Sequence, residues 1–457
     1  MNWTTRTNFM PKIYNNGLKP IRYRSFSMNL DWLNWDKEHC WHPYTQHGID
    51  TNPLAVVSAQ DATLHLADGR KLIDGISSWW SVLHGHAQGE LIEALQYQTA
   101  TLDHVLFAGC THEPAASLSR QIVKMVNENT EGFEGPNLNR VFFSDNGSTA
   151  VEVALKMAYQ SAVKKGEAHK NIFIALEDSY HGDTFGAMSL SDPDPFFQTF
   201  KPFLFEVVRI PPTEEALQAA LEQHGPNTAA VILEPILQGA AGMNFHSADF
   251  VRATRRLCDE HNTFFIADEV ATAFGRLGSL LACDFAQVRP DFLCLSKGLS
   301  GGILPLALTL THEGIFDLFK SPSRADAFFH GHTFTANPIA CNAANASLRL
   351  FKKNNVPERF TEIGKLILDN LSPELKSHPQ VELRHQGAIV ALALKEEDAG
   401  YLSGIGEKLR AACLAHNEVL LRPLGSVLYT FPLACVTDEE AVKIAKALSE
   451  IALSALD

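Results

Sequence analysis

Short apolar runs alternate with helical patterns from about residue 139 onward. Strands are predicted at 140–144, 171–176, 229–233, 263–267, 291–295 and 304–310. The periodicity between them predicts helices at 148–162, 214–223 and 248–260. Because these strands are apolar throughout, we expect an α/β fold with a mostly parallel sheet that helices cover on both faces. Ligands of such sheets bind beyond the carboxyl ends of the strands.

The pattern changes after Asn337, where a long helical stretch leads out of this region. Period-two runs at 388–394, 418–421 and 427–431 predict strands, and 439–453 predicts a closing amphipathic helix. The turn-rich segment 41–75 is expected to pack with them. We therefore predict a small α+β domain formed by 28–80 and 346–457, and a large cofactor-binding domain at 81–345.

Composition and charge exclude several classes of protein. The chain has 457 residues, and its 46% hydrophobic content is typical of a globular protein. A formal net charge of −14 disfavours binding to nucleic acid or to an anionic membrane. No apolar run approaches the ~20 residues of a membrane-spanning helix, so we expect a cytoplasmic location. The eight cysteines include no CxxC pair, and we expect mostly buried, reduced thiols.

The N-terminus differs from the rest of the chain, because residues 1–30 carry basic residues and no acid. This charge pattern is that of a transit peptide, but Asn and Pro make a poor amphipathic helix. Met28 offers a later start. We expect 1–27 to be a disordered or artefactual extension, with a targeting segment as the alternative.

Two polar residues stand at the ends of predicted strands. Asp268 follows the run 263–267, and Lys297 follows 291–295. A lysine that ends a buried strand needs a partner, because burying an unpaired ammonium is costly. A salt bridge is one solution, and capture of the amine by a carbonyl group is the other. Burial lowers a lysine pKa and so favours the second. Asp268 taken alone is a helix cap or an ion-pair partner.

Further strand-end residues favour a cofactor. Gly147 and Ser148 lie where a strand meets a helix, which suits a phosphate, although a plain N-cap is the commoner use of such a serine. Tyr180 and Glu234 also follow strands. A phosphate cradle, a stacking ring, an acid for a ring nitrogen and a lysine for an aldehyde together make a pyridoxal phosphate site.

Two motifs carry a family resemblance. They are FIADEVATAFGR at 265–276 and PDFLCLSKG at 290–298. Both are similar to the signature of class III pyridoxal phosphate aminotransferases, and the likeness extends from about Trp41 to the C-terminus. The resemblance implies fold type I, with a seven-stranded central sheet, a smaller domain and a homodimer whose active sites lie at the subunit interface.

Four local strings narrow the resemblance to one branch of the class. They are WHPYT at 41–45, DGISSWW at 74–80, YHGDTFGAMS at 180–189 and RPLG at 422–425. This branch acts in biotin synthesis, where it converts 8-amino-7-oxononanoate to 7,8-diaminononanoate. S-adenosylmethionine is the usual amino donor, and lysine is the alternative.

The resemblance also implies roles for individual residues. Lys297 forms the internal aldimine in a ping-pong reaction, and Asp268 keeps the pyridinium nitrogen protonated. The implied catalytic residues are Lys297, Asp268 and Tyr44, and the implied cofactor-binding residues are Gly147, Ser148, Tyr180, Asp268, Lys297 and Thr333. The implied substrate-binding residues are Tyr44, Trp79, Tyr180, Asp183, Lys297, Gly331, Arg422 and Tyr429. Thr333 would act from the partner subunit, and His332 departs from the proline that relatives often have there.

Physical chemistry is consistent with the substrate assignments. Arg422 offers a bidentate fork for the carboxylate of a fatty keto acid, and Trp79 and Trp80 offer apolar walls. Interface packing of the tryptophans and a salt bridge of Arg422 are the alternatives. The histidines near Gly85 and Gly331 lack acidic or cysteine partners, so we expect no metal. Another class III ω-amino acid or diamine transaminase is the alternative function, and a catalytically inactive binding protein is a second.

Overall fold

The computed structural model describes residues 31–50, 52–192, 197–395 and 404–456. The expected extension at 1–27 therefore lies outside the described residues. All eight cysteines fall within them as free thiols, and five of these are buried: Cys258, Cys283, Cys294, Cys341 and Cys413. Within the described ranges, no helix is both long and apolar enough to cross a bilayer.

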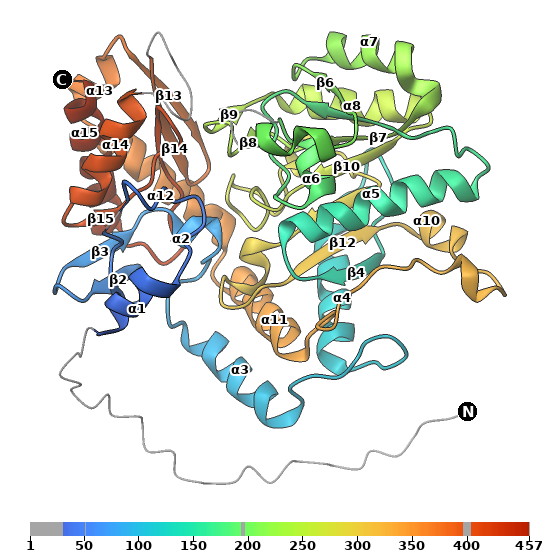
Figure 1. The fold of residues 1–457 in the computed structure, drawn as a ribbon, viewed down its shortest axis with the longest axis horizontal. Coiled ribbons are helices and arrows are strands. Elements are labelled where there is room, and N and C mark those ends of the chain that lie inside the picture. The colour runs from blue at the N-terminus through green and yellow to red at the C-terminus, as the bar shows by residue number, and fades with distance from the viewer. Residues whose placement is uncertain (1–30, 51, 193–196, 396–403, 457) are drawn as a thin grey trace.

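A seven-stranded sheet occupies the centre of the larger part of the molecule (Figure 1). Its spatial order is β4 (Arg140–Ser144), β12 (Ala307–Thr311), β11 (Phe292–Leu295), β10 (Phe264–Asp268), β7 (Thr228–Leu233), β5 (Ile172–Leu176) and β6 (Val208–Ile210). Only β12 runs antiparallel to its neighbours within this sheet. The expected mostly parallel sheet is confirmed, and the carboxyl ends of all strands except β12 meet at one edge.

Helices cover both faces of this sheet. Because successive residues of a strand point to opposite faces, each strand contributes to two cores. Ala230 and Ile232 of β7 pack in one core with α5 (Gly147–Lys164). Val231 and Leu233 pack in another core with α4 (Glu113–Val126) and α8 (Ala248–Glu260). The largely apolar strand sequences follow from this burial on two faces.

The other elements of this part are shorter or lie further from the sheet. They are α3 (Gly89–Thr101), α6 (Phe185–Leu190), α7 (Glu214–His224), α9 (Cys283–Ala286), α10 (Glu313–Leu318), β8 (Leu237–Gln238) and β9 (Asn244–Phe245). Helix α11 (Pro338–Lys353) packs against α3 and α4 and leads out of this part, as the sequence predicts.

The two ends of the chain share a second group of sheets. One sheet has the order β1 (Val56–Gln60), β2 (Thr63–Leu66), β3 (Lys71–Asp74) and β15 (Val419–Leu420), and the other has β13 (Val381–Gln386), β14 (Ile389–Leu394) and β16 (Val427–Thr430). The helices here are α1 (Asp31–His39), α12 (Val356–Asn370), α13 (Pro373–Ser377), α14 (Gly404–Ala415) and α15 (Asp438–Leu456). Figure 1 shows the blue strands β2 and β3 beside red β15, and β3 pairs in parallel with β15. The predicted domain limits at 80 and 345 stay a prediction.

Candidate active site

A pocket of about 460 Å³ opens beyond the carboxyl edge of the seven-stranded sheet. The ends of β4, β10 and β11 and the start of α5 contribute to its wall. Its polar lining residues are Ser81, Asp145, Asn146, Ser148, Tyr180, His181, Glu234, Asp268, Ser296 and Lys297. The volume lies within the range of about 300–1,000 Å³ that small-molecule sites occupy.

Lys297 lies half-buried in this pocket, directly after β11. Its Nζ lies 4.7 Å from the centre of the Trp80 ring. No carboxylate of the described residues forms an ion pair with it, so the salt-bridge alternative has no support here. Burial lowers the pKa of Lys297, while the charges of Asp268 and Glu234 oppose that shift. A buried amine with a lowered pKa is a suitable nucleophile.

Asp268 ends β10 and points into the same pocket. Its Oδ2 lies 2.8 Å from Nδ1 of His181, and its Oδ1 accepts the N–H of Val270. No partner for Nε2 of His181 is found among the described residues, although this atom is buried. Since the imidazole holds one carboxylate oxygen and the Val270 N–H holds the other, Asp268 keeps a defined orientation.

Glu234 follows β7 and lies behind this pair, fully buried. Its carboxylate accepts the N–H groups of Tyr180 and Gly239, each at 3.1 Å. Burial raises the pKa of Glu234 to about 7, while nearby His181 opposes this shift. Glu234 therefore anchors the backbone that carries Tyr180.

The N-terminus of α5 forms a cradle on the opposite side of the pocket. Asn146 caps the helix, because its side chain accepts the N–H of Thr149 while Thr149 Oγ1 accepts the N–H of Asn146. Ser148 Oγ accepts the N–H of Asp183 at 3.1 Å. At Gly182, φ is +125° and an added Cβ would lie 1.9 Å from Ser148 Oγ. Only glycine permits this close approach of the loop to the helix.

Tyr44, Tyr180 and Asp183 form a hydrogen-bonded cluster at the mouth of the site. Tyr44 donates its hydroxyl to Asp183 at 2.7 Å, and Tyr180 donates to the same carboxylate at 3.0 Å. Burial raises the pKa of Tyr180 well above its ordinary value, and the hydrogen bond with Tyr44 adds to the shift. The Tyr180 phenol is therefore a neutral donor, and the hydrogen bond from Tyr44 to Asp183 joins residues 139 positions apart in the sequence.

The two tryptophans differ in position. Trp80 is buried against Lys297 and lines the pocket, whereas Trp79 is 40% exposed and contacts the ring of Tyr44. Both belong to the short turn α2 (Ser77–Trp80), whose four residues have φ values of 49°, 47°, 77° and 71°. Left-handed backbone costs about 1–2 kcal/mol for each such non-glycine residue, so surrounding contacts must hold this turn.

Arg422 and Tyr429 occupy different environments. The guanidinium carbon of Arg422 lies 5.1 Å from the centre of the Trp79 ring. None of the described carboxylates forms a salt bridge with Arg422, which leaves its fork open to a ligand. Tyr429 is fully buried behind the pocket, where its hydroxyl accepts the Trp80 indole N–H at 3.0 Å. Tyr429 thus contacts the wall residue Trp80, and it is not among the residues that line the pocket.

Gly331 and Thr333 lie apart from this pocket, on the exposed connection between β12 and α11. Between them, His332 accepts the N–H of Phe334 through Nδ1, and its backbone N–H bonds Thr335 Oγ1. The single chain therefore does not bring Gly331 and Thr333 to Lys297. Their predicted roles depend on a second subunit and stay predictions.

The residues around the pocket fit pyridoxal phosphate. The helix N-terminus at Gly147 and Ser148 suits the phosphate, and Asp268 suits a ring nitrogen. The amine of Lys297, which forms no ion pair with a described carboxylate, suits an aldehyde. These groups come from three elements that converge on a volume large enough for the ring.

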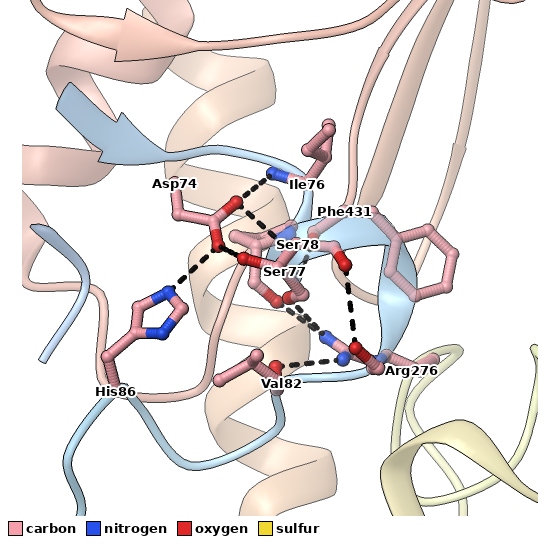
Figure 2. A network of polar contacts seen from close by, with 10 residues as sticks. Asp74, Ile76, Ser77, Ser78, Val82, His86, Arg276 and Phe431 are labelled. Atoms are coloured by element: carbon pink, nitrogen blue, oxygen red, sulfur yellow. Dashed lines mark hydrogen bonds and ion pairs between the residues drawn. The ribbon is translucent and has the colours of Figure 1, made fainter. Parts of the chain in front are cut away.

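Sequence reasoning assigned no role to His181, Asp74 or Arg276. His181 stands next to Tyr180 in a quoted motif, but only the folded chain shows its contact with Asp268. Asp74 and Arg276 contact the strained turn α2 through hydrogen bonds (Figure 2). Each of the three is a titratable residue inside a motif that is otherwise rich in apolar and small residues, and this is the signal that could have identified it.

Comparison with known proteins is consistent with this geometry. The family model described as "Aminotransferase class-III" matches residues 44–452. The chain therefore belongs to the class III aminotransferases. An adenosylmethionine-8-amino-7-oxononanoate aminotransferase from Synechococcus elongatus is 44% identical over 428 residues, which cover 90% of this chain and 98% of that protein.

Solved structures show the same relationship. The adenosylmethionine-8-amino-7-oxononanoate aminotransferase of Methanocaldococcus jannaschii superposes with a TM-score of 0.87 at 34% identity, covering 93% of this chain and 99% of that one. An amine transaminase from an uncultivated Pseudomonas species, described as bound to pyridoxal phosphate, gives 0.81 at 28% identity, with 91% and 98% covered. The fold type predicted from the motifs is confirmed.

Proposed function

We propose that this chain converts 8-amino-7-oxononanoate to 7,8-diaminononanoate in biotin synthesis, with S-adenosylmethionine as amino donor and pyridoxal phosphate as cofactor. The observation that carries the proposal is the open guanidinium of Arg422 over Trp79, next to the lysine pocket. A fatty keto acid that ends in a carboxylate matches this apolar wall and its cation. The two relatives named for this reaction add support.

The chain's own residues bind the cofactor in this proposal. Gly147 and Ser148 at the start of α5 would hold its phosphate, and Asp268 would hold a proton on its ring nitrogen. Bound there, pyridoxal phosphate supplies an aldehyde for the amine and an electron-withdrawing ring. His181 positions the carboxylate of Asp268 through the 2.8 Å contact with its Nδ1.

Lys297 carries the proton in the proposed reaction. With the cofactor bound, its Nζ would take a proton from the substrate carbon that bears the amine and return it at the aldehyde carbon of the cofactor. Burial lowers its pKa, so the neutral amine that this step requires is accessible. Trp80 lies over the same Nζ and keeps water away from it.

The substrate is oriented from the opposite side. Tyr44 and Tyr180 present two hydroxyl groups that Asp183 holds in place. Because both phenols are anchored to one carboxylate, they can position a polar group of the substrate near Lys297. Arg422 would bind the carboxylate at the far end of the chain.

The proposed enzyme is a cytoplasmic homodimer. Thr333 and Gly331 lie away from their own pocket, on an exposed segment that a second subunit can reach. In this arrangement, Thr333 completes the phosphate cradle of the partner, and Gly331 contacts the partner's substrate.

The decisive experiment is an assay of the purified enzyme with 8-amino-7-oxononanoate and one donor at a time. We expect 7,8-diaminononanoate with S-adenosylmethionine, and growth of a biotin auxotroph that is blocked at this step. Product with lysine alone would change the donor and keep the acceptor. A well-expressed chain that turns over ω-amino acids but not the keto acid would contradict the proposal.

A further inference from the structure

The turn α2 delivers both tryptophans of the site from a left-handed backbone. Ser77, Ser78, Trp79 and Trp80 all have φ between 47° and 77°. Trp80 then lies 4.7 Å from Lys297 Nζ, and Trp79 lies 5.1 Å from the Arg422 guanidinium. An ordinary backbone at these residues would direct both indoles elsewhere, so the shape of the site depends on whatever holds this turn.

One carboxylate holds the entry to the turn. Asp74 is fully buried at the end of β3 and accepts the backbone N–H groups of Ile76 and Ser78 on Oδ1, at 3.2 and 3.0 Å. Its Oδ2 accepts the hydroxyl of Ser78 at 2.7 Å and lies 3.0 Å from Nε2 of His86. Figure 2 shows Ile76, Ser78 and His86 arranged around this single side chain.

A guanidinium group holds the C-terminal end of the turn. Arg276 is fully buried and donates to the carbonyls of Trp80, Val82 and Pro432 and to Ser77 Oγ. Its contacts are spread over several segments, whereas both oxygens of Asp74 act on the first residues of the turn. His86 is itself fixed, because its backbone exchanges two hydrogen bonds with Asp61, so it locks the orientation of the carboxylate.

We propose that Asp74 is a positioning residue for the substrate pocket, with His86 as its orienting partner. Asp74 touches neither Lys297 nor the substrate residues and acts through the conformation of Ser77–Trp80. Only the kinetic test of this inference, which uses the keto acid as substrate, rests on the proposed function.

The variant Asp74→Asn tests this role. In asparagine, an NH2 group, which is a donor, replaces one of the two acceptor oxygens. This NH2 group must then face either the N–H groups of Ile76 and Ser78 or the side chains of Ser78 and His86. We expect the KM for the keto acid to rise about tenfold or more, because hydrogen bonds to a charged group are lost and Trp79 moves from its place. Ser78→Ala, which removes only the Oδ2 contact, should give a smaller rise.

Asp68→Asn is the matched control. Asp68 lies near the same strands and pairs with Arg70 at the surface, without contact to the turn. Its KM should equal that of the wild type. The absorption of bound cofactor should be unchanged in all three variants, since the cradle and Asp268 lie on other elements.

Tryptophan emission gives a readout that needs no substrate. The emission spectrum should change in Asp74→Asn, and this change should disappear when Trp79→Phe and Trp80→Phe are introduced as well. A folded Asp74→Asn enzyme with wild-type emission and wild-type KM would overturn the proposal, as would a change in emission that persists without the two tryptophans. A wild-type enzyme that is inactive on the keto acid would instead contradict the proposed function, and the emission experiment would still decide the role of Asp74.

Discussion

Lys297 illustrates how burial selects chemistry at the scale of a single residue. Another lysine, Lys170, is buried more deeply, but its amine donates to the carbonyl of Asn262 and pairs with Glu167. Lys297 has an aromatic ring over Nζ and no ion pair with a described carboxylate. The same residue type is therefore a structural anchor in one place and a candidate nucleophile in the other.

Replacement of Lys297 by alanine should remove the absorption band of the lysine-linked cofactor. It should also lower kcat by at least about 10²–10⁴, the usual contribution of a positioned acid–base group. Absorption spectra and steady-state assays of the purified variant measure both effects. Lys170→Ala should reduce stability and keep the band, and a Lys297→Ala enzyme that kept band and turnover would contradict the assignment.

Glu234 should make stability depend on pH. Burial raises its pKa from 4.5 to about 7, so the folded chain binds a proton that the unfolded chain releases. Below pH 4.5 the carboxyl of Glu234 therefore does not lower the free energy of unfolding. As pH rises from 4.5 to about 7, ionisation of Glu234 lowers this free energy progressively. Above pH 7 the cost is full, about 3 kcal/mol.

Urea unfolding of wild type and Glu234→Gln at pH 5 and pH 8 measures this cost. The wild type should lose more unfolding free energy between the two pH values than the variant, which cannot titrate at this position. Glu269, whose pKa burial also raises to about 7, is present in both proteins and so cancels in the comparison. Equal losses in the two proteins would show that Glu234 does not carry the effect.

At the scale of elements, the cofactor cradle depends on the contact between α5 and the loop after β5. The helix supplies Ser148, and the loop passes so close to it that Gly182 has no room for a side chain. Gly166, at the other end of the same helix, also has a positive φ of +81°, but an added Cβ would meet no atom within 4 Å. A side chain at Gly166 would therefore meet only an unfavourable φ, whereas a side chain at Gly182 would also clash with Ser148.

Gly182→Ala should weaken cofactor binding by about tenfold or more, because the loop must move away from Ser148. Gly166→Ala should cost only the roughly 1 kcal/mol of an unfavourable φ and leave the affinity unchanged. Titration of the apoenzyme with pyridoxal phosphate measures both variants. Equal affinities would show that the cradle tolerates the displaced loop.

The predictability of an element follows from how local its determinants are. Strands β7, β10 and β11 are buried on both faces and are apolar apart from a terminal Thr228 and Asp268, so their positions agree with the sequence prediction to within one residue. The short edge strand β6 (Val208–Ile210) has little pattern and was not predicted. The left-handed turn at Ser-Ser-Trp-Trp was not predicted, because it depends on the distant Arg276 as well as on hydrogen bonds to the nearby Asp74.

The same distinction applies to the site. Asp268, Lys297 and Ser148 could be predicted from strand ends, since the carboxyl ends of parallel strands meet at one edge. The contact of His181 with Asp268 and the burial of Tyr429 behind Trp80 depend on tertiary packing, which no spacing in the sequence specifies.

At the scale of the whole molecule, segments from both ends of the chain shape one site. Tyr44 and Trp79 come from the N-terminal segment, and Arg422 comes from the C-terminal one. The parallel pairing of β3 with β15 places these segments side by side. Thr333 remains outside this arrangement, and that is the structural reason to expect a dimer with shared sites.

Shared sites predict that two inactive variants complement each other. In Lys297→Ala the lysine is lost, and in Thr333→Asp a carboxylate would repel the phosphate in the partner's cradle. A mixed dimer of the two contains one site with Lys297 from one subunit and an intact Thr333 from the other. After subunit exchange at equal amounts, about a quarter of wild-type activity should return, because half of the dimers are mixed and each has one intact site of two. Activity that stays at the level of the separate variants, although sequential purification through a different affinity tag on each variant recovers mixed dimers, would place Thr333 outside the partner's site.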